Sequence, residues 1–276
     1  MTKILEVLIC TCNDGIISVP EVLLQIRPDV RYLVSHQIFP ETELSDQALA
    51  TCEVLSKRED LRISTTSSVG LSINRNNALK RARGDFLLIA DDDIQLISDA
   101  PTQILQLFKN HQNIGCCTCR VRTPSGDLYK KYKGVGSLHN KISILGVSSI
   151  EVVLRRSAIV SENLFFDERF GLGSIYPIAE EAIFLGDMLR KNISILRSNI
   201  DVAIHDAVGS GQEFGTESAC RARGALFRRS LGWLGLPLLL VQSIKRYPRY
   251  KGTMSFAYYV KTSLVAFFKL EDNCNR

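Results

Sequence analysis

The hydrophobic positions in the first half of the chain come in short continuous runs rather than in strict alternation. One run, residues 4–10, ends in a polar turn, and another, residues 85–90, leads directly into three aspartates. Runs of this length are typical of strands covered on both faces of a parallel sheet. Apolar residues between the runs recur at helical spacing, so the pattern predicts β-α-β alternation. The expected strands are residues 4–10, 31–35, 61–65 and 85–90, and the expected helices are residues 19–26, 46–56, 71–82 and 101–110.

The second half is less regular. It predicts strands at 114–122 and 148–155 that need not be parallel, a helix at 177–191, and short strands at 193–196 and 202–205. Residues 209–216 are rich in glycine, are expected to be flexible, and mark the end of the body. We therefore expect an α/β domain over residues 1–215 and a helical extension over residues 216–276.

Composition and charge narrow the function classes. Of the 276 residues, 45% are hydrophobic and 23% charged, which disfavours disorder and coiled coil. No uncharged apolar run reaches the roughly 18 residues that cross a bilayer, which argues against a polytopic membrane protein. The net charge of +5 belongs to residues 216–276, which hold 11 of the 34 basic but only 3 of the 29 acidic residues. The remaining body is slightly acidic, which argues against nucleic acid as the main partner.

The basic extension itself permits two interpretations. Apolar stretches within residues 229–269 alternate with Lys and Arg and with Trp233, Tyr247 and Tyr250. This pattern suits a segment that lies in the headgroup region of an anionic membrane. Equally, the helices could cover the sheet or a dimer partner.

The cysteines and the N-terminus favour a cytoplasmic protein. Cys116 and Cys119 have C-x-x-C spacing, but no second cysteine pair or pair of histidines matches them, so free thiols in a reducing compartment are the simplest expectation. The start of the chain does not have the pattern of a signal peptide.

Asp91, Asp92 and Asp93 follow a predicted buried strand, at the end where open α/β sheets bind their ligands. Adjacent carboxylates repel one another, so a cation such as Mg²⁺ or Mn²⁺ would explain them, and a solvated helix cap is the alternative. His205 ends a short predicted strand and is a second candidate ligand, although a lone histidine is more often structural.

Two further groups could carry chemistry. Glu180 and Glu181 lie early in a predicted helix, where one of them could act as a general base or both could simply stabilise the helix N-terminus. Arg75 and Asn76 lie near the start of a basic helix, which could bind an anion or be merely a solvated cationic surface.

Taken in order, these segments resemble family 2-type glycosyltransferases with the GT-A fold. The resemblance spans about residues 4–206 and rests on the turn Cys10-Thr11-Cys12-Asn13, on Gly70-Leu71-Ser72 with Arg75-Asn76, on Ile89-Ala90-Asp91-Asp92-Asp93, and on Phe166-Asp167-Glu168 with Glu180-Glu181. It implies a Rossmann-like mixed sheet flanked by helices, followed here by the helical extension. It also implies a nucleotide-diphospho-sugar donor and a glycan or lipid-linked acceptor.

The resemblance assigns roles to individual residues. Thr11, Asn13, Arg75 and Asn76 would bind the nucleotide-sugar together with Asp91 and Asp92, while Asp93, Asp91 and His205 would hold Mn²⁺ or Mg²⁺. The acidic pair usually reads Glu-Asp, so Glu181 would be the base, or Glu180 if the longer side chain of Glu181 does not fit. The implied reaction is a sugar transfer with inversion in bacterial surface polysaccharide biosynthesis, at the cytoplasmic face of the membrane. The alternatives are a sugar-phosphate nucleotidyltransferase, whose glycine-rich loop after strand one is missing here, and a catalytically silent scaffold.

Overall fold

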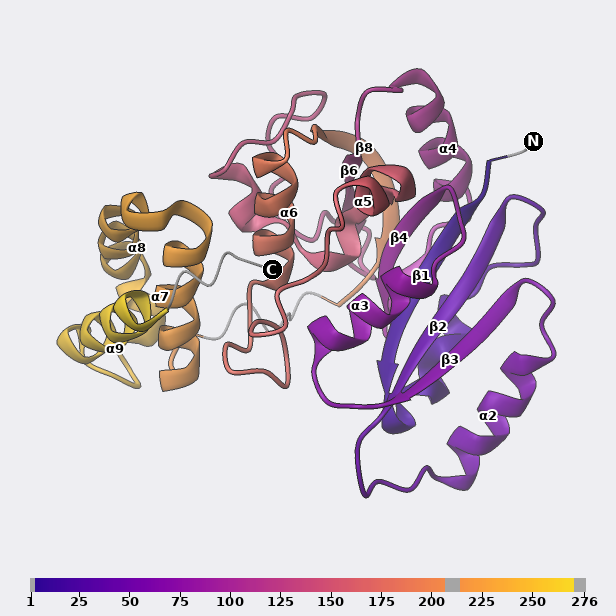
Figure 1. Cartoon of the computed structure of the whole chain (residues 1–276), viewed down its shortest axis with the longest axis horizontal. Helices are drawn as coiled ribbons and strands as arrows, with labels where there is room; N and C mark the ends of the chain where they lie inside the picture. Colours follow the sequence, from indigo (N-terminus) through magenta and orange to yellow (C-terminus); the bar gives the residue numbers. More distant parts are fainter. Residues whose placement is uncertain (1–2, 207–213, 271–276) are drawn as a thin grey trace.

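The computed structural model describes residues 3–206 and 214–270 and shows an α/β fold. One sheet of eight strands has the order β3-β2-β1-β4-β7-β6-β8-β5 (Figure 1). The neighbours from β3 to β4 are parallel, whereas β7 runs antiparallel to both β4 and β6. The expected mixed sheet flanked by helices is therefore confirmed.

The N-terminal half follows the predicted alternation closely. Its elements are β1 (Leu5–Cys12), α1 (Val19–Val22), β2 (Val30–Ile38), α2 (Asp46–Ser56), β3 (Leu61–Ser67), α3 (Leu71–Arg81), β4 (Phe86–Asp91), β5 (Gln95–Leu96) and α4 (Ala100–Asn110). The predicted helix at 19–26 is too long, because α1 has only one turn. Residues 13–18, directly before it, form a 3₁₀ helix. The two-residue strand β5 was not predicted.

The second half departs further from the prediction. Its elements are β6 (Cys116–Arg122), β7 (Val152–Arg155), α5 (Arg156–Ser161), α6 (Glu180–Arg190) and β8 (Ile195–Ile204). The strand expected at 148–155 begins with a 3₁₀ turn at Ser149–Glu151. The two short strands expected at 193–196 and 202–205 are one strand, β8, which tolerates polar residues because it pairs with β6 through an irregular register.

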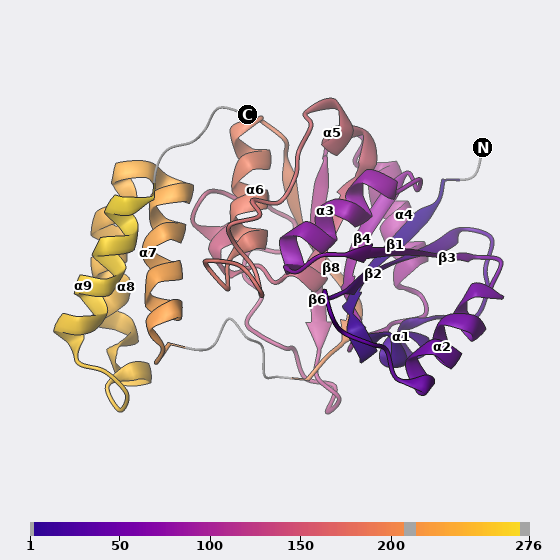
Figure 2. The ribbon, with the colours of Figure 1, turned by 60° about the horizontal axis from the view of Figure 1, so that its bottom comes forward.

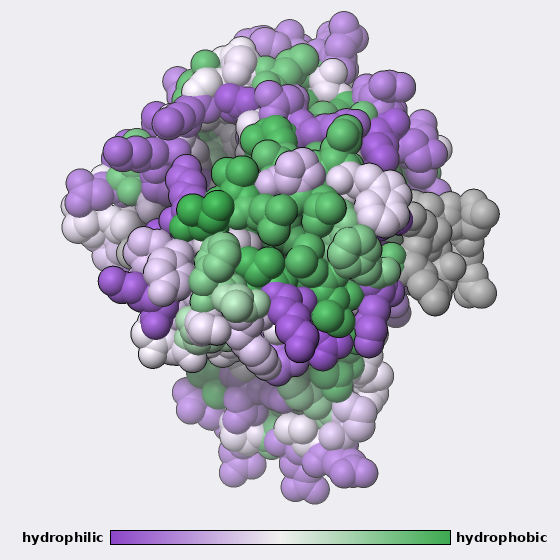
Figure 3. Space-filling view, turned by 90° about the vertical axis from the view of Figure 1, so that its left-hand side faces the viewer, coloured by the Kyte–Doolittle hydropathy of each residue, from purple (hydrophilic) through white to green (hydrophobic). Residues whose placement is uncertain are grey.

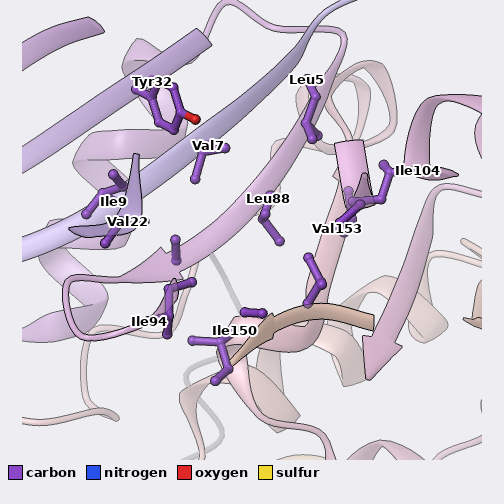
Figure 4. Close-up of a cluster of buried hydrophobic side chains, with 14 of the residues drawn as sticks. Leu5, Val7, Ile9, Val22, Tyr32, Leu88, Ile94, Ile104, Ile150 and Val153 are labelled. Carbon is purple, nitrogen blue, oxygen red and sulfur yellow. The ribbon is translucent and has the colours of Figure 1, made fainter. Parts of the chain in front are cut away.

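Strand β1 explains why the apolar runs are continuous. Leu5, Val7 and Ile9 point into one core with residues of α1, α2 and α4, as Figure 4 shows for part of that cluster. Leu8 and Cys10 point into the opposite core with residues of α3, α5 and α6. Because side chains alternate along a strand, a strand covered on both faces is apolar at most positions. The buried Glu6 is an exception, and its carboxylate accepts hydrogen bonds from Arg62 and from the backbone N–H groups of Arg83 and Gly84.

The extension consists of three helices, α7 (Glu217–Leu231), α8 (Gly235–Tyr250) and α9 (Phe256–Lys269). They form a layer at the end of the molecule away from β3, with α7 beside α6 (Figure 2). Ala222, Ala225 and Leu226 of α7 pack with Ala182 and Ile183 of α6. The boundary at residue 215 stays a prediction. The glycine-rich residues 209–213 and Cys274 lie outside the described residues.

Candidate active site

The site is built where the carboxyl ends of β1 and β4 lie side by side. The two strands are parallel, and Cys10 of β1 is in register with Asp91 of β4. Thr11 follows on β1 and Asp92 follows on β4, and the Thr11 hydroxyl donates a hydrogen bond to Asp92 Oδ2. The topology therefore joins the first polar turn to the aspartates, as is usual at the carboxyl end of an open α/β sheet.

Gly15 allows this close approach. A Cβ at position 15 would lie 2.5 Å from Asp92 Oδ2 and 2.7 Å from Thr11 Oγ1, so any side chain there would push the turn away. Burial raises the pKa of Asp92, the Thr11 hydrogen bond opposes that rise, and the charges of Asp93 and Asp91 add to it. A cation near the aspartates would favour the charged carboxylates and so lower the pKa of Asp92 again.

Arg75 is the buried centre of the site. Its side chain is 1% exposed, and its guanidinium joins Glu180 Oε1 at 2.6 Å to Asp91 Oδ1 at 3.0 Å. The ring of Phe166 lies 5.7 Å from its Cζ atom. Burial by itself would lower the pKa of Arg75, but Asp91 and Glu180 outweigh burial and hold that pKa above its usual value. The arginine therefore stays charged and fixes a carboxylate from β4 relative to one from α6.

Asp93 and His205 form the outer part of the site. Asp93 Oδ2 lies 3.4 Å from His205 Nε2, and the Asp93 side chain is 63% exposed. The ring of Tyr129 meets the His205 ring edge-on at 5.7 Å. His205 Nδ1 is buried without a hydrogen-bond partner. Two predicted metal ligands are thus brought together at the mouth of the site.

The two glutamates at the start of α6 have different surroundings. Glu180 is buried and holds Arg75, whereas Glu181 Oε2 is buried without a hydrogen-bond partner. Burial, and next the charge of Glu180, raise the pKa of Glu181 well above its usual value. Ala179, which precedes the helix, has a φ of +79°. Such a backbone conformation is unfavourable for alanine and is found disproportionately at functional sites.

Asn13 and Asn76 use their amides to hold loops together. Asn13 Oδ1 accepts a hydrogen bond from the backbone N–H of Phe39, and Asn76 Nδ2 donates to the Phe166 carbonyl and to Glu168 Oε1. The Asn76 Oδ1 atom accepts from the Phe166 N–H. Both residues therefore position the walls of the site, and direct contact between them and the nucleotide stays a prediction.

The donor set at the aspartates was tested against a divalent metal. Among the residues of 3–206 and 214–270, no three His, Cys, Asp or Glu side chains converge closely enough to hold a metal ion by themselves. Mg²⁺ in nucleotide sites usually takes one or two carboxylates and completes its shell with phosphate oxygens and water. Asp93 supplies one such carboxylate with the His205 nitrogen beside it, whereas Asp91 Oδ1 is bonded to Arg75.

Sequence reasoning missed several residues that shape the site. Ser149 Oγ lies 3.5 Å from Asp91 Oδ2, and Ser72 Oγ donates to the Phe170 carbonyl at 2.5 Å. A Cβ on Gly171 would lie 3.1 Å from Ser72 Oγ and 3.4 Å from Glu180 Cδ. The glycines of the two loops were a usable signal. Ser149 lies in a predicted strand that gave no sign of a site, and Tyr129 lies in a segment without any recognisable pattern.

Comparison with known proteins decides what kind of site this is. Residues 45–155 match the family model described as "Glycosyl transferase family 2". That segment runs from α2 to β7 and includes Arg75 and all three aspartates. The chain therefore has the GT-A fold and is similar to family 2 glycosyltransferases over that segment. The resemblance seen in the sequence is therefore confirmed.

Solved structures share the fold of this chain. S. aureus TarS 1–349 in complex with UDP-GlcNAc has a TM-score of 0.64 and 16% identity, over 97% of this chain and 80% of that one. The mannosyltransferase PcManGT from Pyrobaculum calidifontis, in complex with GDP-Man and Mn²⁺, has a TM-score of 0.56 and 12% identity, over 96% of this chain and 74% of that one. No curated protein matches the glycosyltransferase in sequence.

Proposed function

We propose that this glycosyltransferase moves one sugar from a nucleotide-diphospho-sugar to a hydroxyl of a glycan or lipid-linked acceptor, with inversion, in bacterial surface polysaccharide biosynthesis. The observation that carries the proposal is the Arg75 bridge. The bridge fixes Asp91 relative to helix α6. Asp91 lies next to the outer Asp93–His205 pair, and on α6 Glu181 has a carboxylate oxygen without a hydrogen-bond partner. Arg75 thus connects the strand that leads to the Asp93–His205 pair with the helix that carries the proposed base. The TarS and PcManGT structures, which hold nucleotide-sugars, support the donor class.

Each group has a defined part in the proposed reaction. Thr11, Asn13, Asn76 and Asp92 line or support the nucleoside end, and Asp91 and Arg75 lie beside it. Asp93 and His205 would hold Mn²⁺ or Mg²⁺, with Asp91 as the further predicted ligand. The bound ion would neutralise charge on the leaving diphosphate. Arg75 adds a fixed positive charge that needs no reorganisation during the reaction.

Glu181 is the proposed base and Glu180 the residue that positions it. The acceptor hydroxyl would give its proton to Glu181 while its oxygen bonds to the anomeric carbon. The bond from that carbon to the diphosphate oxygen would break, and the diphosphate would keep the electron pair. A raised pKa suits a general base, because it brings proton affinity closer to the working pH. Glu180 is less available because Arg75 occupies it.

Nucleotide binding is the first test. Thermal unfolding would be followed with UDP, GDP, CDP and dTDP, with and without Mn²⁺, on the unaltered protein and on Asp93→Ala. A ligand at about 100 times its dissociation constant adds about 2.7 kcal/mol to the free energy of unfolding. We expect one nucleotide to act, only with metal, and not on Asp93→Ala. Asp99→Ala, which removes an equally exposed acid outside the site, is the control. Absence of any nucleotide response would instead favour a scaffold protein.

The exposed end of the extension supports a peripheral position at the inner face of the cell membrane. Figure 3 shows apolar side chains gathered at this end of the molecule, with hydrophilic residues around them. Trp233 is 61%, Val241 60% and Ile244 65% exposed. One helical stretch, Glu217–Tyr250, is long and apolar enough to cross a membrane by length and composition alone. However, this stretch consists of two helices, α7 and α8, with Gly232, whose φ is +60°, between them.

The charges beside this face favour an anionic lipid surface over a protein partner. Lys245 follows Ile244, Lys269 follows Phe268, and all four side chains are exposed. Each such basic residue near an anionic bilayer contributes about 1 kcal/mol. Apolar residues with adjacent lysines are what an interfacial helix presents to a membrane.

Vesicle binding tests this part of the proposal. We expect the protein to cosediment with vesicles containing anionic lipid and not with neutral ones, and Val241→Glu to reduce binding at least tenfold. Val160→Glu is a matched control, because Val160 is 61% exposed on α5, in the body. Failure to bind anionic vesicles, or a dimer that Val241→Glu dissociates, would contradict the membrane proposal.

A further inference from the structure

A second cavity lies beside the aspartates and has a different character. Its volume is about 250 Å³, and it lies between β6, β8 and the segments before and after residue 140. Basic side chains dominate its charged lining, which consists of Lys130, Lys131, Lys133, Arg197 and the single acid Glu151. Ligand pockets for whole small molecules usually measure about 300–1,000 Å³. This cavity therefore suits one group of a larger molecule.

The positive charge of the cavity is only partly balanced. Lys130 Nζ lies 2.5 Å from Glu151 Oε1, and the Tyr132 hydroxyl donates to the same oxygen at 3.2 Å. Within residues 3–206 and 214–270, no ion pair involves Lys131, Lys133 or Arg197. Arg197 donates only to backbone carbonyls, and its Nε atom is buried without a hydrogen-bond partner. Three positive charges thus remain for a ligand.

His139, the other titratable group of the lining, does not add to this charge. Its ring nitrogens lie 2.9 Å from Thr118 Oγ1 and 2.9 Å from Ser143 Oγ. Burial first, and next the charges of Arg197 and Lys130, lower the pKa of His139 to about 4. The ring is therefore neutral near pH 7. His139 therefore contributes no positive charge to the cavity.

Two chain segments that line the cavity also contact residues of the donor site. Tyr129, next to Lys130 in the chain, packs on His205, which in turn contacts Asp93. Ser149, two residues before Glu151, lies 3.5 Å from Asp91. A molecule bound near Asp91 and Asp93 would therefore need to extend along these segments to place a group in the cavity.

We propose that the basic cavity binds an anionic group, a phosphate or a carboxylate, of the acceptor. The proposal rests on the function proposed above and deepens it, because it makes the preferred acceptor an acidic glycan or a phosphate-bearing lipid carrier. The donor diphosphate is a poorer candidate, since the aspartates provide its metal-dependent site. An anion in the cavity would meet Lys131, Lys133 and the unpartnered Arg197 Nε, which form charge-assisted hydrogen bonds.

Binding of inorganic phosphate tests the cavity without any enzymatic step. Calorimetric titration in the absence of divalent metal keeps phosphate away from the aspartates, and repetition on Asp93→Ala checks this. We expect Lys131→Gln/Lys133→Gln to weaken phosphate binding about tenfold or more, the size of a charge-assisted hydrogen bond. Lys141→Gln, an exposed lysine outside the cavity, should bind as the unaltered protein does. No binding, or equal binding by the double variant, would overturn the proposal.

Acceptor preference distinguishes the two sources of the anion. Matched acceptors with and without a phosphate, and with and without a carboxylate, would be compared. We expect the double variant to raise KM for the anionic acceptor about tenfold with little change in kcat, and to leave the neutral acceptor unaffected. The nucleotide thermal shift is read in parallel. A normal nucleotide shift with no anion preference refutes only the cavity proposal, whereas loss of the nucleotide shift in the unaltered protein refutes the proposed function.

Discussion

Replacing Arg75 by methionine should be one of the most damaging single changes in the body of the protein. Methionine fills similar space but leaves Glu180, whose side chain is 8% exposed, without its cation. Removing one partner of a buried ion pair costs about 3–5 kcal/mol. Loss of the Arg75–Asp91 pair adds little to this cost, because the Asp91 side chain is 33% exposed and ion pairs of that exposure contribute about 1 kcal/mol or less. We therefore expect a loss of about 3–5 kcal/mol.

Urea unfolding followed by circular dichroism measures this loss. Lys80→Met is the matched control, since Lys80 lies on the same helix, is exposed, and makes only a contact with the Phe165 ring at 5.4 Å. It should cost less than about 1 kcal/mol. If Arg75→Met does not fold, Arg75→Lys remains measurable, because lysine keeps the charge but cannot bridge both carboxylates with a planar fork. An Arg75→Met protein within about 1 kcal/mol of the unaltered one would refute the buried bridge.

Three further changes test other parts of the site. Glu181→Gln should abolish transfer but keep nucleotide binding, and near pH 8 the variant should be more stable than the unaltered protein. The reason is that the pKa of Glu181 is raised in the folded state, so its ionisation lowers the free energy of unfolding as pH rises above the ordinary value of 4.5. The difference in stability, measured by urea unfolding, should therefore vanish below that pH. Gly15→Ala should cost about 1–3 kcal/mol in urea unfolding and weaken the nucleotide thermal shift, whereas Gly252→Ala, where a Cβ would meet nothing within 4 Å, should do neither. Arg229→Met should speed proteolysis between body and extension, because Arg229 joins Asp167 at 3.0 Å and Asp187 at 2.9 Å, while Arg221→Met on the exposed face of the same helix should not.

The parts of the fold that sequence predicted well are those where burial dictates residue type. Strand β1 is apolar at most positions because cores lie on both of its faces, and the run at 4–10 indicated this directly. Helix α2 was predicted with its observed ends from its helical pattern, and in the structure Ser45 caps it by accepting from the Ala48 N–H. The position of the aspartates followed from the end of β4.

The contacts that sequence could not predict join residues far apart in the chain. Arg75 and Glu180 are separated by 105 positions, and neither residue's neighbours indicate the other. The single strand β8 was misread as two because its polar residues, such as Asp201, pair with arginines of β6 rather than marking a turn. The basic cavity lies under residues 129–147, where no element has a recognisable period.

The electrostatics of the site separate its tasks. Asp91, Asp92 and Asp93 make one side unfavourable for anions until a cation binds, while the cavity of Lys131 and Lys133 attracts anions without one. Arg75 cannot serve the cavity, because its charge is already shared between Asp91 and Glu180. A donor diphosphate would thereby be admitted only together with its metal, whereas an acidic acceptor would be held without metal. This division would keep the two anionic substrates in separate sites. The aspartates would repel an acidic acceptor, and the basic cavity would not provide the metal that the donor diphosphate needs.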